Sequence, residues 1–267
     1  MKVLLARLVA LGVLVLTVTT ANAQVFQIDY MKAESGDYVQ IEQEVWKPIH
    51  EERIKAGALL NWTLYSVGYG FDDSYTHVTV NVYPDMAALE ASYGDSFPGF
   101  VAAAHPDGNW DEISARTEAS RHIVKTEIWS GVTYTGDFHA PVSVIAYMKV
   151  AQGGWGPYVG MERSIFQPIQ EARIADDEME AWGIYSLWFP GGSDYQYNFA
   201  AVNSYQSLTQ MSGDSVSMSD RVEAIHPNLS MEQVNHMVNK TRELVRSEVW
   251  WTVDHAHGAE AESETGQ

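Results

Sequence analysis

The phrase KPIHEERI at residues 47–54 returns, nearly unchanged, as QPIQEARI at residues 167–174. Both stretches lie in segments whose apolar residues recur with the period of a helix. Proline inside a helix removes a backbone hydrogen bond, so each copy is expected to bend or restart at the same place. A phrase of this length repeated within one chain indicates an internal duplication, which must be identified before a fold is assigned.

The similarity continues on both sides of this phrase, in unchanged order. The matching residues are Tyr30-Met31-Lys32 and Tyr147-Met148-Lys149, Trp62 and Trp182, His105 and His226, Arg121 and Arg242, Glu127 and Glu248, and Trp129 and Trp250. The spacing between the copies changes only in stretches that form loops, such as GGWGP. We therefore interpret the chain as two copies of one unit.

Each copy reads as strand, helix, strand, strand, helix, strand. In the first copy these are residues 25–32, 38–58, 62–69, 75–82, a helical region in two pieces (85–93 and 109–122), and 123–129. This order is the ferredoxin-like split βαβ arrangement. The predicted fold class is α+β, with two tandem ferredoxin-like (βαββαβ) units packed sheet to sheet as a pseudo-twofold α/β barrel.

The domain boundaries follow from the repeat. They are a signal peptide at 1–23, a first repeat at 24–133, a linker at 134–141, a second repeat at 142–253 and an acidic tail at 254–267 that is expected to be disordered.

The first 23 residues have a basic start, an apolar run and a small-residue ending, Ala21-Asn22-Ala23. This pattern predicts a secretory signal peptide and a periplasmic or secreted protein. A membrane anchor is the alternative, but Arg7 interrupts the apolar run.

The chain contains no cysteine, which excludes a disulfide framework. With 35 acidic and 16 basic residues the chain repels nucleic acid and anionic lipid, so neither is expected as a partner after signal cleavage.

The repeated element order resembles the dimeric α/β-barrel superfamily in its tandem single-chain form, and it is similar to NIPSNAP or EthD-like domains. The resemblance implies a pocket between helices and sheet in each half, used for small apolar or aromatic molecules. The superfamily includes cofactor-independent monooxygenases, isomerase-like enzymes, haem enzymes and members with no known activity. The Gly-x-x-Asp-Gly phrase of dye-decolourising peroxidases is missing here, which argues against haem.

Helix 38–58 carries two charged residues on its apolar side, Glu42 and Arg53, and the second copy repeats them as Glu162 and Arg173. A carboxylate facing the sheet must be paired or hydrogen-bonded, or its pKa rises until it is neutral. Glu42 is thus a candidate base or ligand-orienting group; the alternative is a structural hydrogen-bonding role shared by both copies. The expected partners of Glu42 are Lys32, Tyr65 or Ser66.

Histidine supplies a second candidate catalytic group. His77 lies in a predicted strand on the same side as Thr79 and Asn81, whereas alignment of the copies places Tyr197, Phe199 and Ala201 at the matching positions. The first copy then offers a polar sheet face, and His77 is a candidate general base; a surface-facing strand histidine is the alternative. His105 and His226 are expected to end helices.

The remaining candidates are ligand-binding residues around the same helix and sheet. They are Asn81, Tyr38, Trp46, Tyr65, Glu162 and Tyr158. No motif for a metal or another cofactor is present, and His255 and His257 are assigned to the tail. Two functions stay open: an exported protein that binds, or transforms without a metal, a small apolar or aromatic compound, and a non-catalytic interaction or structural module whose pockets are filled by side chains.

Overall fold

The computed structural model describes residues 24–258, apart from residues 71–72, 93 and 214. The predicted signal peptide and the end of the predicted tail therefore lie outside the described residues. The elements of the first half are β1 (Val25–Ala33), α1 (Tyr38–Ile41), the π-helical turn η1 (Glu42–Trp46), α2 (Lys47–Lys55), β2 (Asn61–Tyr69), β3 (His77–Tyr83), α3 (Met86–Ala91), α4 (Phe97–Ala104), α5 (Trp110–Ser120) and β4 (Arg121–Gly136).

The second half repeats this order. Its elements are β5 (Val142–Lys149), α6 (Trp155–Met161), the π-helical turn η2 (Glu162–Phe166), α7 (Gln167–Ala175), β6 (Ala181–Phe189), β7 (Phe199–Tyr205), α8 (Leu208–Met211), α9 (Met218–Ile225), α10 (Met231–Thr241) and β8 (Glu243–His257).

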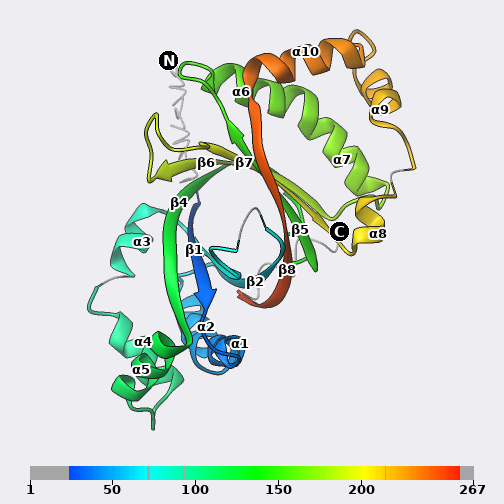
Figure 1. Cartoon of the computed structure of the whole chain (residues 1–267). Coiled ribbons are helices and arrows are strands. Elements are labelled where there is room, and N and C mark those ends of the chain that lie inside the picture. The colour runs from blue at the N-terminus through cyan, green and yellow to red at the C-terminus, as the bar shows by residue number, and fades with distance from the viewer. Residues whose placement is uncertain (1–23, 71–72, 93, 214, 259–267) are drawn as a thin grey trace, which may run out of the picture.

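The strands form one closed antiparallel barrel in the order β1-β3-β2-β8-β5-β7-β6-β4. The two halves are therefore joined edge to edge, at β2–β8 and at β4–β6, and no strand edge of the described barrel is left open. Helices α1–α5 cover one side of the barrel and α6–α10 the opposite side (Figure 1). Within the described residues, no helix combines the length and apolar character needed to cross a membrane.

Strand alternation divides each half into an inner and an outer layer. On β1, Tyr30 belongs to the cluster inside the barrel, whereas Asp29 and Met31 lie on the outer face below the helices. The barrel interior is filled by large aromatic side chains, and the outer face carries the helices. Any pocket of useful size therefore has to lie between helix and sheet.

The bend predicted at the proline is a π-helical turn. The backbone N–H of Lys47 bonds the carbonyl of Glu42, five residues back, and the same bond recurs at the end of η2. Pro48 and Pro168 then fall in the first turn of α2 and α7, where a missing N–H is tolerated. The chain stays helical throughout, so the repeated phrase marks a bulge and not a break.

The structure changes two boundaries. β4 extends to Gly136, so residues 134–136 belong to a strand and not to a linker. β8 includes Asp254–His257, which pair with residues of β2 and are not part of a disordered tail. Both strands are long because each pairs with one half and then crosses to the other, a long-range pairing that local periodicity does not reveal. Helix α4 has no counterpart among the elements predicted from the sequence.

Candidate active site

A cavity of about 490 Å³ lies in the first half, between the helix formed by α1, η1 and α2 and the outer face of the sheet. Helix α4 and the start of β4 complete its wall. Of the residues predicted from the sequence, Glu42, Trp46 and Asn81 line this cavity together. They come from η1 and β3, so the cavity is built by the packing of helix on sheet.

Glu42 enters the cavity from η1 and is only 2% exposed. Its carboxylate forms an ion pair with the guanidinium of Arg121, with 3.0 Å between Oε1 and Nε. Burial raises the pKa of Glu42 above its ordinary value, against the opposing charge and hydrogen bond of Arg121. The partner expected on the sheet is thus Arg121, at the first position of β4, and not Lys32, Tyr65 or Ser66.

The sheet contributes polar side chains to the floor of the cavity. Asp29 accepts hydrogen bonds from Thr126, at 2.6 Å, and from Gln27, at 2.9 Å, and burial raises the pKa of Asp29 against these bonds. Asn81 is buried, and its Oδ1 has no hydrogen-bond partner in the described part of the protein. A buried amide oxygen without a partner is costly, so Asn81 is prepared to accept a hydrogen bond from a ligand.

The aromatic walls come from two helices and the sheet. Trp46 and Phe97 lie with their ring centroids 6.3 Å apart, and the ring of His50 stacks on Trp62 at 5.2 Å. His50 also accepts a hydrogen bond from Arg53 through Nδ1 at 3.0 Å. Burial, followed by the charges of Arg53 and Arg121, lowers the pKa of His50 well below its ordinary value, so the imidazole is neutral near pH 7.

In the second half, the space around the corresponding glutamate, Glu162, is filled by hydrophobic side chains. Its hydrophobic cluster extends from the sheet to α9 and α10 and includes Met148, Met161, Phe199 and Val222. Glu162 is buried there beside Arg242, at 3.6 Å, and burial raises the pKa of Glu162 to about 7 against that charge. The second half has a cavity of about 440 Å³ between the sheet and Trp155 and Arg163, but Glu162 is not among the residues that line it. The glutamate is therefore kept in both halves, but of the two described cavities only the one in the first half is lined by it.

The strand register corrects the alignment of the two copies at β3. His77 pairs with Met31, and the residue that pairs with Met148 in the second half is Phe199. The positions matching His77, Thr79 and Asn81 are therefore Phe199, Ala201 and Asn203, two residues later than predicted. The reason is that the loop between β6 and β7 is two residues longer than the loop between β2 and β3. The alignment of the two copies from sequence did not place this insertion.

The other predicted site residues of the first half do not line the cavity. His77 packs its ring on Tyr38, with 4.8 Å between centroids, and its Nδ1 lies 3.0 Å from the hydroxyl of Thr76. Tyr38 itself is buried at the start of the same helix, next to Glu42. Tyr65 points to the opposite face of the sheet, into the barrel.

In the second half, Tyr158 occupies the place of Tyr38. Its ring packs against Phe199, with 4.7 Å between centroids, within the filled core. Tyr158 and Glu162 are therefore buried in a packed region and do not face a described cavity.

Sequence reasoning missed Arg121 and His50 as members of the site. Arg121 is separated from Glu42 by most of the first half, and only the repeated pair Arg121 and Arg242 signalled its importance. His50 stands at the fourth position of KPIHEERI, where the second copy has Gln170. This difference between His50 and Gln170, inside an otherwise repeated phrase, was the sequence signal that could have identified His50 as a site residue.

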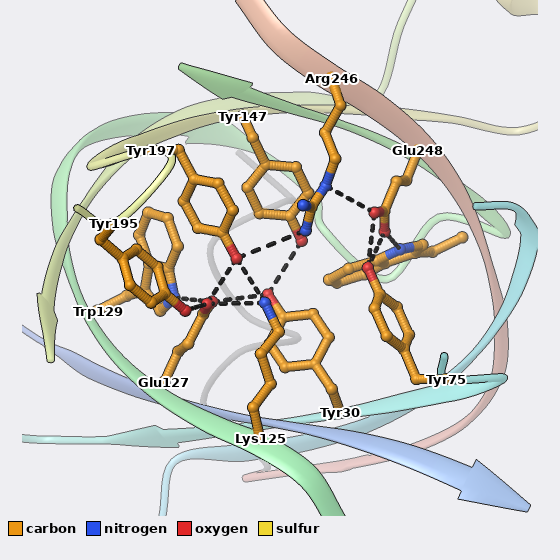
Figure 2. A network of polar contacts seen from close by, with 11 residues as sticks. Tyr30, Tyr75, Lys125, Glu127, Trp129, Tyr147, Tyr195, Tyr197, Arg246 and Glu248 are labelled. Carbon is orange, nitrogen blue, oxygen red and sulfur yellow. Dashed lines mark hydrogen bonds and ion pairs between the residues drawn. The ribbon is translucent and has the colours of Figure 1, made fainter. Parts of the chain in front are cut away.

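The barrel interior holds a second group of polar residues, but side chains fill it (Figure 2). The hydroxyls of Tyr30 and Tyr147 meet at 2.9 Å, and Tyr30 also donates to Glu127 at 2.8 Å. Glu127 forms an ion pair with Lys125 at 2.9 Å, and Glu248 forms one with Arg246 at 3.0 Å. Further bonds to these two glutamates come from Tyr75, Trp129, Tyr195, Tyr197 and Trp250. We interpret this network as structural.

His255 and His257 of β8 lie beside His139, which precedes β5. His139, His255 and His257 gather with ring centroids 4.7 to 5.4 Å apart. His139 already contacts Asp137 through Nδ1 at 2.7 Å and Asn61 through Nε2 at 2.9 Å. In the described ranges, no group of three or more His, Asp or Glu side chains is arranged to hold a metal ion.

No protein-family model matches the sequence, and no curated protein matches it. Solved structures do match the fold. A candidate monooxygenase from Lactobacillus acidophilus NCFM has a TM-score of 0.53 and 10% identity, over 88% of this chain and 97% of that chain. A candidate monooxygenase from Fusobacterium nucleatum has a TM-score of 0.50 and 8% identity, over 88% and 95%. A haem-binding protein from Thermus thermophilus has a TM-score of 0.47 and 9% identity, over 87% and 92%.

The two candidate monooxygenases have the dimeric α/β-barrel fold, and at such low identity the likeness establishes the fold alone. The chain therefore has an α+β closed-barrel architecture of the dimeric α/β-barrel type.

Proposed function

We propose that this chain is an exported small-molecule-binding barrel protein, built from two ferredoxin-like units, whose ligand is an aromatic compound held in the cavity of the first half. The difference between the halves carries the proposal: the inward glutamate of the first half, Glu42, lines a cavity of about 490 Å³, whereas Glu162 lies in a packed core and does not line the cavity of about 440 Å³ in the second half. Export is supported by the leader pattern in residues 1–23, and the NIPSNAP or EthD-like relationship by the repeated element order.

The lining of the cavity supports an aromatic ligand with polar substituents. Trp46, Trp62 and Phe97 offer flat apolar surfaces on which a ring can pack. Asn81 offers a buried oxygen that lacks a hydrogen-bond donor in the described structure. A few convergent polar groups on an apolar wall are typical of a small-molecule site.

Glu42 is the group best suited to chemistry on a bound compound. Its pKa is raised by burial, and Arg121 fixes its position. A carboxylate in this state accepts a proton readily from a ligand held against it, and the resulting acid can return the proton. The reaction that the site favours is therefore a proton transfer that needs no metal. The second half, whose glutamate Glu162 lies in a packed core, serves as scaffold.

Binding of 2-naphthamide and 2-naphthoate, measured by calorimetry, tests the location of the site. Asn81→Leu removes the unpaired oxygen and places an apolar side chain in the cavity, so we expect binding to weaken by at least about 10-fold. Asn203→Leu is the matched control, because Asn203 faces Trp182 as Asn81 faces Trp62. If the two variants weaken binding equally, or if the unmodified protein binds neither compound, the proposal is wrong.

A further inference from the structure

The cavity is lined by a buried arginine that has no acidic partner among the described residues. Arg53 is 5% exposed and lies at the end of α2. Its guanidinium donates to Nδ1 of His50 at 3.0 Å and to the hydroxyl of Tyr83 at 2.9 Å, and its Nε has no partner within the described residues. The described residues also contain no carboxylate within ion-pair distance of Arg53, whereas Glu42 pairs with Arg121. Arg53 is thus a cation held by neutral groups.

His50 does not compensate this charge, because its pKa is lowered well below the ordinary value and the ring is neutral. Tyr83 offers the face of its ring, 5.5 Å from the guanidinium carbon, as well as its hydroxyl. These contacts orient the guanidinium but add no negative charge. A buried charge without a counter-ion is strongly unfavourable.

The second half solves the same problem with acidic residues. Arg173, the counterpart of Arg53, lies 3.7 Å from Glu178, which also pairs with Arg221 at 2.6 Å. Glu178 donates its backbone N–H to the carbonyl of Arg173, as Ala58 does to Arg53, both at 2.9 Å. Alanine therefore stands in the first half at the position where the second half has the counter-ion.

We propose that the counter-ion of Arg53 is supplied by the ligand, so that the compound bound in the cavity is an aromatic carboxylate. The carboxylate pairs with the guanidinium of Arg53, and the ring packs on the aromatic walls described above. Arginine matches a carboxylate geometrically and is the residue typical of such sites. This inference rests on the proposed function and names the class of its ligand.

The two naphthalene probes separate the inference from the proposed function, because they share a ring and differ in charge. We expect 2-naphthoate to bind about 10- to 100-fold more tightly than 2-naphthamide, the difference typical of a buried charged hydrogen bond. Equal binding of both probes would overturn the carboxylate inference and leave the cavity as a binding site. Absence of binding by both would overturn the two proposals together.

Ala58→Glu supplies a test through the protein itself. The new carboxylate reproduces the arrangement of Glu178, so we expect the unliganded protein to melt roughly 2–4 °C higher and the preference for naphthoate to disappear. Ala58 does not line the cavity, and Ala58→Gln is the uncharged control of the same size, expected to keep the preference. An Ala58→Glu protein that gains no thermal stability, or that still prefers naphthoate, would show that Arg53 needs no counter-ion.

Discussion

At the scale of single residues, the site combines groups whose pKa values are shifted in opposite directions by burial. Glu42 and Asp29 have raised pKa values, and His50 has a lowered one. Burial thus disfavours the charged forms of both carboxyls and of His50, while Arg53 and Arg121 keep their charges in the lining of the same cavity. The consequence for a ligand is a preference for negative charge, in agreement with the unpaired position of Arg53.

His50 gives the protein a pH dependence that can be measured. The unfolded chain binds a proton at this residue near pH 6.5, and the folded protein does so only at much lower pH. The contribution of His50 to the free energy of unfolding is therefore constant above about pH 7 and falls as the pH drops below about 6.5, by up to about 1.4 kcal/mol per pH unit.

We expect His50→Gln, which copies Gln170 of the second half, to remove this loss. The free energy of unfolding should be measured with urea from pH 5 to pH 8. Above pH 7 it should change with pH equally in wild type and variant, and below pH 6.5 it should fall more steeply in wild type. His122→Gln is the control, since His122 is exposed and contacts Glu34 at the surface. If the free energy of unfolding depends on pH in the same way for His50→Gln and wild type, folding does not lower the pKa of His50.

At the scale of elements, each π-helical turn is held by a histidine from a distant helix end. Nε2 of His105 donates to the carbonyl of Val45 at 3.0 Å, and His226 makes the same bond to Ile165. Because a carbonyl only accepts, both imidazoles carry their proton on Nε2. The histidines stand at the C-terminal ends of α4 and α9, and in addition they brace the turn that carries the inward glutamate.

Removal of this brace should destabilise the protein. His105→Ala leaves the carbonyl of Val45 without its donor, and we expect the free energy of unfolding to fall by about 1–2 kcal/mol. His122→Ala, at an exposed ion pair, should change it by less than about 0.5 kcal/mol. A loss at His105 no larger than that at His122, measured by urea unfolding, would contradict a bracing role.

The elements also show what the sequence could predict. Local periodicity predicted the order of strands and the inward direction of Glu42, because both depend on spacing of two or 3.6 residues. It did not identify Arg121 as the partner of Glu42, since that contact joins residues 79 positions apart. Local periodicity also missed the two-residue register difference between β3 and β7 and the full length of β8. Both features are determined by pairing between strands that are far apart in the sequence.

At the scale of the whole molecule, the barrel interior joins the two halves through paired charges. Tyr30 and Tyr147, which occupy matching positions in the repeat, bond to each other, and each half supplies one glutamate to the network (Figure 2). Burial alone would raise the pKa of Glu127, but Lys125 and the hydroxyls of Tyr195 and Tyr197 hold it below its ordinary value. Glu127 is thus a buried anion on which groups from both halves converge.

Neutralising Glu127 should therefore weaken the contact between the halves. Glu127→Gln leaves Lys125 without its counter-ion and offers the tyrosine hydroxyls a poorer acceptor, so we expect the free energy of unfolding to fall by about 3–5 kcal/mol. Glu52→Gln, in the exposed pair with Lys55, is the control and should change it by less than about 1 kcal/mol. Calorimetric melting of both variants would measure the difference. If Glu127→Gln melts like Glu52→Gln, the network does not hold the barrel together, and the buried charges inside it would need a functional explanation.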